Sequence, residues 1–384
     1  MNCYFETKEK NDCNGCSVCK LRCPKNAIIM EEDYEGFLYP IIDKEKCINC
    51  GLCSKVCSNI PKESENVSRT FAAEYLDENI KKNSASGGLF YPIAKKILEK
   101  KGIVIGVAYD NDFVVKHKVV DNIENLKMFQ GSKYVRSDVN DVYLKAEEAL
   151  NNDRFVLFSG TPCQCSGMRS FLKKNYDKLF TCELICHANP SPKIFEMYKF
   201  NLETKYDKKI SNINFRDKET GWDNAITTIV FDNNLIVYDA SYYRAFVNEL
   251  INRPSCYNCR FCTEKRYSDF SIGDLWGYEK IDSTIKNYNN GISLLNVNTK
   301  KAFDLLGELN LVDLKEVDTK LSFKYNHHKN VLFHKKREKF FRKIKCGDIN
   351  ENNIIDSMGK YIKVGIFQKI IKKIKKILKL NGGK

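Results

Sequence analysis

Two four-cysteine motifs near the beginning of the chain constrain its fold more than any other feature. The first has the spacing Cys-x2-Cys-x2-Cys-x3-Cys-Pro over residues 13–24, and the second repeats it over residues 47–57 without the proline. Bacterial ferredoxins hold two [4Fe-4S] clusters with this spacing. Three cysteines on a tight loop reach three corners of one cube, while the fourth begins a short helix and points toward the other cube. The pattern therefore predicts a small domain with two clusters.

Exchange of the fourth cysteine divides the eight thiols into two ligand sets. The first set is Cys13, Cys16, Cys19 and Cys57, and the second set is Cys47, Cys50, Cys53 and Cys23. A pair of zinc sites is the alternative, although a triple with this spacing is not the usual arrangement of zinc ligands. Apolar residues on either side of residues 33–36 predict a short hairpin that covers the clusters. Cys3 belongs to neither motif.

The chain has 17 cysteines among its 384 residues, and the cellular compartment decides how they are used. Residues 1–6 lack a basic segment followed by an apolar run, so we expect no secretory signal. No window approaches the ~20 apolar residues of a membrane-spanning helix. We therefore expect a cytoplasmic protein in which thiols stay reduced and act as metal ligands or redox groups rather than in disulfides.

The net charge of +14 comes from the C-terminal part of the chain. Residues 320–345 hold ten Lys or Arg against one acid, and residues 360–384 hold nine Lys and no acid. The rest of the chain is net acidic. Because no aromatic-interleaved basic motif accompanies this charge, we expect no nucleic-acid partner.

Short strand-like runs alternate with segments of helical periodicity after the linker that follows the cysteine motifs. The strand-like runs are residues 102–109, 113–120, 154–158 and 179–185, and the helical segments are residues 89–100, 141–150 and 166–175. This alternation predicts an α/β domain. Residues 210–240 have the pattern of an antiparallel insertion.

Three loops in this region carry residue types suited to ligand binding. Residues 84–88 (Ser-Ala-Ser-Gly-Gly) precede a helix whose N-terminus favours an anion, or they form a plain N-cap. Residues 131–134 (Gly-Ser-Lys-Tyr) combine a flexible glycine with a hydroxyl, a cation and an aromatic ring, or form an ordinary surface turn. Residues 159–165 join a strand to a helix, where α/β folds bind ligands. Cys163 in this loop is a ligand, a nucleophile or a small core residue.

A third group of cysteines repeats the cluster spacing without a fourth cysteine nearby. It consists of Cys256, Cys259 and Cys262. We predict a third cluster here rather than a zinc site, because the spacing copies the N-terminal motifs. The fourth ligand must come from a distant part of the chain, and the candidates are Cys163, Cys165, Cys182 and Cys186, with Cys163 and Cys186 preferred.

Taken together, these motifs resemble the coenzyme F420 hydrogenase/dehydrogenase beta-subunit family, in the branch with an N-terminal two-cluster ferredoxin domain. The resemblance is carried, in family order, by residues 84–88, 131–134, 160–164, 186–187, 215–218, 221–222, the Cys256 triple and residues 271–277. One departure is Ala188, where the family usually has glycine, and its extra bulk bears on the substrate pocket.

The resemblance implies an oxidoreductase that contains FAD and iron–sulfur clusters. The FAD site that it implies consists of Ser86, Gly87, Gly88, Gly131, Ser132, Lys133, Tyr134, Gly160 and Thr161. The chain lacks a Gly-x-Gly-x-x-Gly turn before a helix, so we expect the flavin to be held by another arrangement. The candidate catalytic residues are His187 for proton transfer, Lys133, and Arg216, which together with Lys218 is suited to neutralise an acidic substrate. A packing role for His187 and a solvated turn around Arg216 are the alternatives.

We therefore predict an α+β or α/β protein with a small ferredoxin-like domain, a larger mixed α/β flavin-binding domain and a C-terminal basic amphipathic helix. The expected boundaries are residues 1–62 for the ferredoxin-type domain, 70–178 and 179–345 for the two beta-subunit regions, and 346–384 for the basic tail. In residues 361–380 isoleucines and lysines occupy opposite helical faces, which suits an anionic membrane surface. Docking of this helix on its own domain or on a partner is the alternative.

The expected function is electron transfer between a ferredoxin-like donor or acceptor, the clusters and an FAD that reduces or oxidises a small substrate. Coenzyme F420 and other organic acceptors, including ones in polysaccharide biosynthesis, are the substrates that the resemblance implies. We expect a cytoplasmic protein, peripheral at the inner membrane face if the tail binds lipid. The alternatives are a non-catalytic electron-relay or assembly protein without flavin, and a zinc-bound interaction module.

Overall fold

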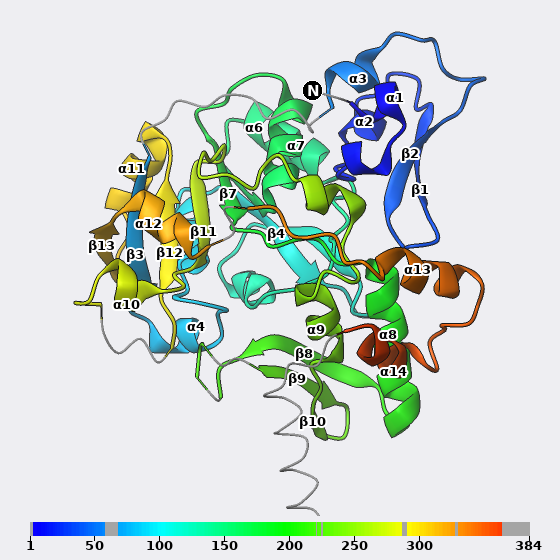
Figure 1. The fold of residues 1–384 in the computed structure, drawn as a ribbon. Helices are drawn as coiled ribbons and strands as arrows, with labels where there is room; N and C mark the ends of the chain where they lie inside the picture. Colours follow the sequence, from blue (N-terminus) through cyan, green and yellow to red (C-terminus); the bar gives the residue numbers. More distant parts are fainter. Residues whose placement is uncertain are drawn as a thin grey trace, which may run out of the picture.

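A small N-terminal module packs against one side of a larger α/β body (Figure 1). The computed structural model describes residues 3–57, 68–219, 221–223, 226–285, 290–326 and 329–362. The predicted amphipathic helix over residues 361–380 lies almost wholly outside these ranges. Among the helices of the described ranges, none is long and apolar enough to cross a membrane.

The N-terminal module consists of short elements set around the two cysteine motifs. They are α1 (Tyr4–Thr7), the 3-10 turn η1 (Lys10–Asp12), α2 (Val18–Leu21), β1 (Ile28–Glu32), β2 (Leu38–Ile42) and α3 (Leu52–Lys55). Ser17 and Gly51 lie before α2 and α3 with φ of 62° and 69°, so each motif turns sharply before its helix. β1 and β2 pair antiparallel, which confirms the predicted hairpin.

The body is built on an eight-stranded mixed sheet with the order β13-β3-β12-β11-β7-β6-β4-β5. The strands are β3 (Arg69–Tyr75), β4 (Ile103–Tyr109), β5 (Val115–Val120), β6 (Val156–Gly160), β7 (Leu179–Leu184), β11 (Phe270–Asp274), β12 (Ser293–Val297) and β13 (Val312–Val317). The central strands β4, β6, β7 and β11 run parallel, and the outer pairs are antiparallel. The central strands are mostly apolar and buried because both faces of the sheet are covered.

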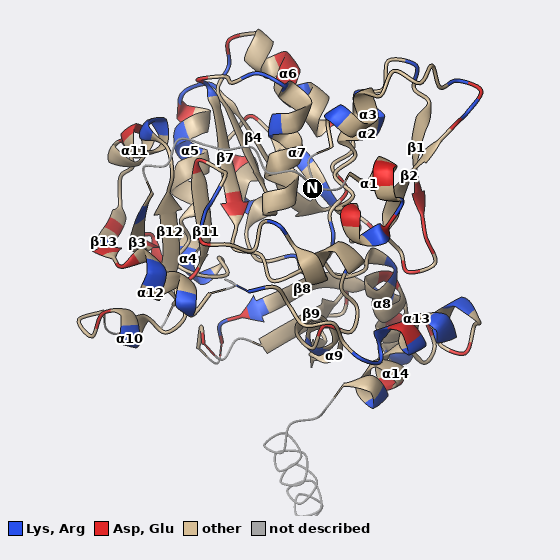
Figure 2. Ribbon diagram, turned by 45° about the horizontal axis from the view of Figure 1, so that its top comes forward, with Lys and Arg blue, Asp and Glu red and all other residues tan. Residues whose placement is uncertain are grey.

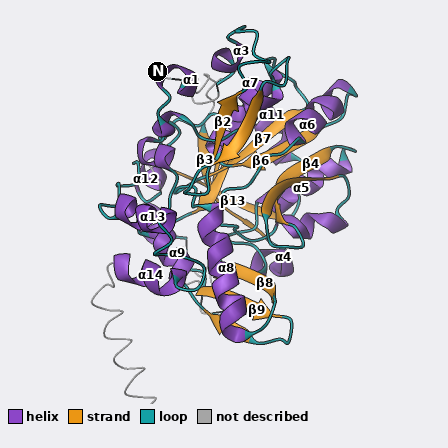
Figure 3. Ribbon diagram, turned by 90° about the vertical axis from the view of Figure 1, so that its right-hand side faces the viewer, coloured by secondary structure: helices purple, strands orange, loops and turns teal. Residues whose placement is uncertain are grey.

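Helices cover both faces of this sheet (Figure 3). On one face α5 (Phe90–Glu99), the 3-10 turn η2 (Glu124–Phe129) and α11 (Lys300–Gly307) bury residues such as Ile97 and Leu305 against the strands. On the other face α6 (Val142–Asn151) and α7 (Pro162–Leu172) pack against the sheet, and Val18 and Val56 of the N-terminal module join the same core. The predicted mixed α/β fold is confirmed. Short helices α4 (Glu78–Lys82), α10 (Tyr278–Ile281) and α12 (Thr319–Lys324) lie near the β13 edge.

A second core lies below the large sheet in the view of Figure 1. It contains α8 (Pro192–Tyr206), β8 (Ile210–Asp217), β9 (Ile226–Phe231), β10 (Ile236–Tyr238), α9 (Ser241–Val247), α13 (Arg337–Lys345) and α14 (Ile354–Tyr361). β8, β9 and β10 form an antiparallel sheet, as predicted for residues 210–240. The basic stretch contributes α13 (Figure 2), in which Lys339, Arg342 and Lys345 are exposed while Phe340 and Phe341 are fully buried. Ile354 and Met358 of α14 belong to the same core.

A buried carboxylate ties the central strands together. Asp269, immediately before β11, accepts hydrogen bonds from Thr181 N (2.8 Å) and Oγ1 (2.9 Å), and from Thr299 Oγ1 (2.9 Å). Arg169 Nη2 lies 3.2 Å from the same carboxylate. Asp269→Ala leaves these buried groups without their acceptor, so we expect it to lower the free energy of unfolding by about 3–5 kcal/mol in urea denaturation. Asp304→Ala, which removes an exposed carboxylate on α11, should change it by less than ~0.5 kcal/mol.

Candidate functional site

A cavity of about 550 Å³ opens at the carboxyl ends of β6, β7 and β11, between the large sheet and the second core. Its walls are formed by residues in five segments: 84–91, 129–137, 159–164, 184–190 and 272–276, with additions from Arg216 and α9. This edge of a parallel sheet is where α/β proteins usually bind ligands. The volume lies in the range of pockets for cofactors and drug-sized molecules.

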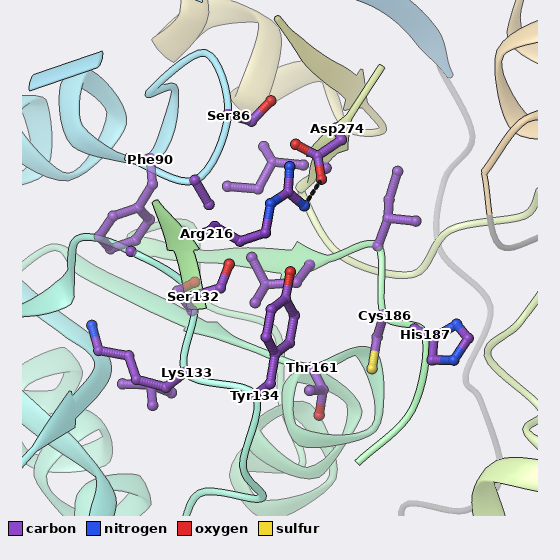
Figure 4. Close-up of a pocket in the computed structure, with 18 of the residues that line it drawn as sticks. Ser86, Phe90, Ser132, Lys133, Tyr134, Thr161, Cys186, His187, Arg216 and Asp274 are labelled. Carbon is purple, nitrogen blue, oxygen red and sulfur yellow. Dashed lines mark hydrogen bonds and ion pairs between the residues drawn. The ribbon is translucent and has the colours of Figure 1, made fainter. Parts of the chain in front are cut away.

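Most of the sequence-predicted site residues meet in this cavity (Figure 4). The residues that line it are Ser86, Gly88, Gly131, Ser132, Lys133, Tyr134, Gly160, Thr161, Cys186, His187 and Arg216. Gly87 lies behind the wall instead, because a Cβ there would be 2.6 Å from Ala73 O. Ser86 Oγ donates to Ile292 O (2.7 Å), and Gly87 N donates to Ser293 Oγ (3.0 Å). These bonds fix the 84–88 loop on the sheet.

Gly131 faces open space in the cavity. Its φ is +75°, and a Cβ built on it meets no atom within 4 Å. The neighbouring Gln130 lines the same wall, and its Nε2 is buried with no hydrogen-bond partner. A donor without an acceptor beside an open glycine fits a ligand with polar ring or chain atoms, such as a flavin.

Two buried lysines hold the loops of the cavity rather than pointing into it. Lys133 Nζ donates to Met128 O (2.9 Å) and Gln130 O (2.8 Å), and burial lowers the pKa of this amine to about 7. Lys218 Nζ donates to Ser86 O (2.8 Å), and burial also lowers its pKa to about 7. In Figure 4 the Lys133 amine lies at the edge of the site, away from Arg216. The Lys133 amine is hydrogen-bonded to two backbone carbonyls, and its role as a catalytic residue stays a prediction.

Arg216 is buried and paired, which excludes the solvated turn. Its Nη1 lies 2.9 Å from Asp274 Oδ2, and Asp274 Oδ1 accepts from Trp222 Nε1 at 2.9 Å. Burial lowers the pKa of the Arg216 guanidinium, but Asp274 and Tyr134 together outweigh burial and raise it. The Arg216 side chain also lies 5.2 Å from the ring of Trp276, another residue of the wall. The pair therefore forms a polar corner beside an aromatic surface.

Aromatic side chains form the floor between this corner and the cysteines. The Tyr134 ring lies 5.1–5.6 Å from the rings of Phe215, Tyr243 and Phe246. His187 packs edge-on against Phe246, and its Nε2 lies 2.9 Å from Glu249 Oε1. The sequence alone gave no signal for Tyr243, Phe246 and Gln130, because their segments carry no motif.

A second, smaller cavity of about 30 Å³ adjoins the first. Five cysteines line it: Cys163, Cys186, Cys256, Cys259 and Cys262. The other two candidates for the fourth ligand are elsewhere, since Cys165 and Cys182 pack in the cores on opposite faces of the large sheet. Thr161, Cys186, His187, Ala188 and Asn189 line both cavities. One wall thus separates the cysteine cavity from the large cavity.

Electrostatic coupling groups four of these five thiols. Burial, and then the charges of Cys256, Cys163 and Cys259, raise the pKa of Cys186. Burial, and then Cys256, Cys163 and the more weakly coupled Cys262, raise the pKa of Cys259. For Cys262 itself burial raises the pKa and Arg266 lowers it. The charges of Cys163, Cys256 and Cys259 thus all act on Cys186, whereas Cys262 acts weakly on Cys259.

The N-terminal module brings together the first predicted ligand set. Burial, and then Cys16, Cys13 and Cys57, raise the pKa of Cys19 well above its usual value. Cys57 of the second motif thus faces the first, as the exchange of fourth ligands requires. In the second set Cys50 is exposed, while the other three cysteines, Cys23, Cys47 and Cys53, are half-buried.

The donor chemistry of these sites is thiol only, which fits iron–sulfur clusters. Within the described ranges, no group of three or more His, Cys, Asp or Glu side chains is placed to hold a single metal ion. Asn14, from the first motif, lines the cysteine cavity, and its buried Nδ2 has no hydrogen-bond partner. A buried donor without an acceptor is accounted for by an electronegative group, such as cluster sulfide, in that cavity.

Two segments of the sequence match known family models. Residues 153–320 match the family model for the C terminus of the beta subunit of coenzyme F420 hydrogenase/dehydrogenase, and residues 12–59 match the 4Fe-4S dicluster domain. A chain of the F420-reducing [NiFe] hydrogenase complex from Methanosarcina barkeri aligns at 16% identity over 78% of this chain and 93% of that chain, with a TM-score of 0.44. No curated protein matches the sequence. Residues 12–59 thus resemble a 4Fe-4S dicluster domain, and residues 153–320 resemble the C terminus of the coenzyme F420 hydrogenase/dehydrogenase beta subunit, as expected of an iron–sulfur redox protein.

Proposed function

We propose that this protein is a flavin-dependent oxidoreductase that exchanges electrons between a ferredoxin-like carrier and a small substrate in the large cavity. The observation that carries the proposal is the shared wall, since Cys186 and His187 line both the cysteine cavity and the large cavity. When bound, the clusters supply one-electron transfer, and a flavin couples it to two-electron chemistry at the substrate. The protein supplies the order of the sites and their insulation from water.

The cysteine sets follow one another from the surface to the large cavity. The second set includes the exposed Cys50, so it suits contact with an external carrier. The first set is more buried, and the neighbouring Asn14 lines the cysteine cavity. The third set shares its wall with the large cavity. This order leads from a surface that an external carrier can contact toward the substrate site.

For the third cluster, we assign Cys163, Cys186, Cys256 and Cys259 as ligands. The assignment rests on the charges of Cys163, Cys256 and Cys259, which all act on Cys186. It rests also on the Asn189 backbone N–H, which donates to Cys256 Sγ at 3.3 Å. Such bonds to ligand sulfur stabilise the thiolate. This proposed ligand set differs from the one expected from spacing alone, in which Cys262 is a ligand and either Cys163 or Cys186 is the fourth.

FAD fits the large cavity in volume and in wall chemistry. Gly131 leaves room at the wall, Gln130 offers a free donor, and Tyr134 provides an aromatic surface. His187, paired with Glu249, is placed to hold a proton at the boundary between the two cavities. The Arg216–Asp274 pair and Trp276 suit a planar substrate with polar substituents, of which coenzyme F420 is one.

The proposal is tested by anaerobic purification with iron, sulfide and flavin measured per chain. We expect about twelve iron atoms and about one FAD. The second candidate function, an electron-relay or assembly protein, predicts the same iron without flavin. A zinc-bound module predicts zinc and no iron. A colourless protein without iron therefore contradicts both redox functions.

A valine at Gly131 is expected to expel the flavin. The side chain fills the open part of the cavity, and a β-branched residue is strained at a φ of +75°. We expect flavin per chain to fall at least tenfold while iron stays near the parent value. Gly347→Val is the matched control, since Gly347 has a φ of +81° and open space on the surface. If both variants keep their flavin, the cofactor does not occupy this wall.

A further inference from the structure

A buried arginine connects the first cysteine motif to the cysteine cavity. Arg136 Nη2 donates to Gly15 O (3.1 Å), within the loop that carries Cys13 and Cys16. Its Nη1 donates to Cys163 Sγ (3.5 Å) and to Thr161 Oγ1 (3.3 Å). The residue is only 7% exposed. One guanidinium therefore contacts the surroundings of two different cysteine sets.

The guanidinium has no carboxylate partner among its described contacts. Its acceptors are a carbonyl, a hydroxyl and a thiol. A buried cation is costly unless anionic groups compensate it. The charges nearest to it are those of the cysteines, since Cys163 and Cys16 both raise the pKa of Arg136 against the effect of burial.

We propose that Arg136 is the positioning residue between two clusters: the inner N-terminal cluster, which is held by the first cysteine set, and the third cluster. Its fixed positive charge stabilises the reduced state of both. This inference rests on the proposed function, and it names a residue that lies outside the cysteine motifs and is absent from the linings of the large cavity and the cysteine cavity. Adding an electron makes a thiolate-bound cluster more negative, so a cation held nearby in a low-dielectric interior favours reduction. The hydrogen bonds at the same time set the distance between the first motif and Cys163.

The test is a redox titration of the full chain, prepared anaerobically and followed by electron paramagnetic resonance. Arg136→Met keeps most of the side-chain volume and removes the charge. We expect it to disfavour reduction of the third cluster at least tenfold, which is a midpoint about 59 mV more negative for a one-electron couple. The inner N-terminal cluster should shift in the same direction.

Arg136→Lys keeps the charge without the fork of donors, and we expect it to restore the midpoints toward the parent values. Arg69→Met is the control, because it removes the same charge from an exposed pair with Glu316 on β3, on the far side of the body. It should leave all midpoints unchanged.

Two outcomes would overturn the inference: parent-like midpoints in Arg136→Met with full iron, or equal shifts in Arg136→Met and Arg136→Lys. If Arg136→Met loses iron, the lysine variant decides alone, and its midpoints must then stay near those of the parent. Failure of the proposed function is distinguishable, because the parent protein itself would then contain no flavin, or would show no cluster signals, before any variant is compared.

Discussion

Cys186→Ser is expected to lower the iron content from about twelve to about eight atoms per chain, whereas Cys262→Ser should leave about twelve. The two thiols line the same cavity, but the charges of Cys163, Cys256 and Cys259 all act on Cys186, whereas Cys262 acts weakly on Cys259. A ligand to iron cannot be removed without loss of the cluster or a strong change in its spectrum. Iron and sulfide analysis with paramagnetic resonance of the reduced protein measures the difference.

Each serine variant is the matched control for the other, since both remove one sulfur from the same cavity. Cys165→Ser provides a third comparison, because this thiol of α7 is buried in the core on one face of the large sheet, away from the cysteine cavity. The N-terminal clusters should persist in all three variants and serve as an internal standard. A loss of four irons in Cys262→Ser with retention in Cys186→Ser would instead support the ligand set expected from spacing.

The ligand sets illustrate what local sequence predicts and what it does not. The exchanged pairing of Cys57 with the first motif follows from spacing, because the two motifs fold within one small module. The third set depends on strand order. Cys163 follows β6 and Cys186 follows β7, and these parallel neighbours end at the same edge of the sheet. A sequence gives the strands but not their order, so the distant cysteines remained alternatives.

The large cavity shows a similar limit. Its loops were predicted from motifs, and the structure brings them together at the expected sheet edge. The direction of side chains could not be predicted, because the carbonyls that bind Lys133 and Lys218 are visible only in the fold. Gly87 likewise reads as a ligand-binding glycine, whereas the fold places it against β3. Motifs therefore indicated the site, and tertiary packing decided which of its residues face a ligand.

A contact across the chain holds the N-terminal module in place. Glu35, in the turn between β1 and β2, forms a two-pronged ion pair with Arg337 of α13, with distances of 2.9 and 2.6 Å. Both side chains are at most 5% exposed. Arg337 also donates to Asn252 O from Nε (3.0 Å) and Nη2 (2.8 Å), two residues before the start of η3 (Pro254–Asn258). The same contact thus links the module to the segment that carries Cys256.

Arg337→Met is expected to lower the free energy of unfolding by about 3–5 kcal/mol, because Glu35 remains buried without its partner. The double variant Glu35→Leu with Arg337→Met should recover most of this loss, since two apolar side chains replace the pair. Lys339→Met, on the exposed face of α13, should have little effect. Urea unfolding followed through cluster absorbance and through tryptophan fluorescence measures the three variants.

The functional effect of Arg337→Met follows from the position of the contact. The clusters of the N-terminal module keep all their ligands, so dithionite should still reduce them at the parent rate. Electron transfer onward to the third cysteine set requires the N-terminal module to stay packed against the body. The buried Glu35–Arg337 ion pair stabilises this packing. We therefore expect flavin reduction from an external carrier to slow at least tenfold in Arg337→Met and to recover in the double variant. Parent-like flavin reduction in the single variant would show that other contacts, such as Arg22 with Glu147 (2.5 Å), seat the module without this pair.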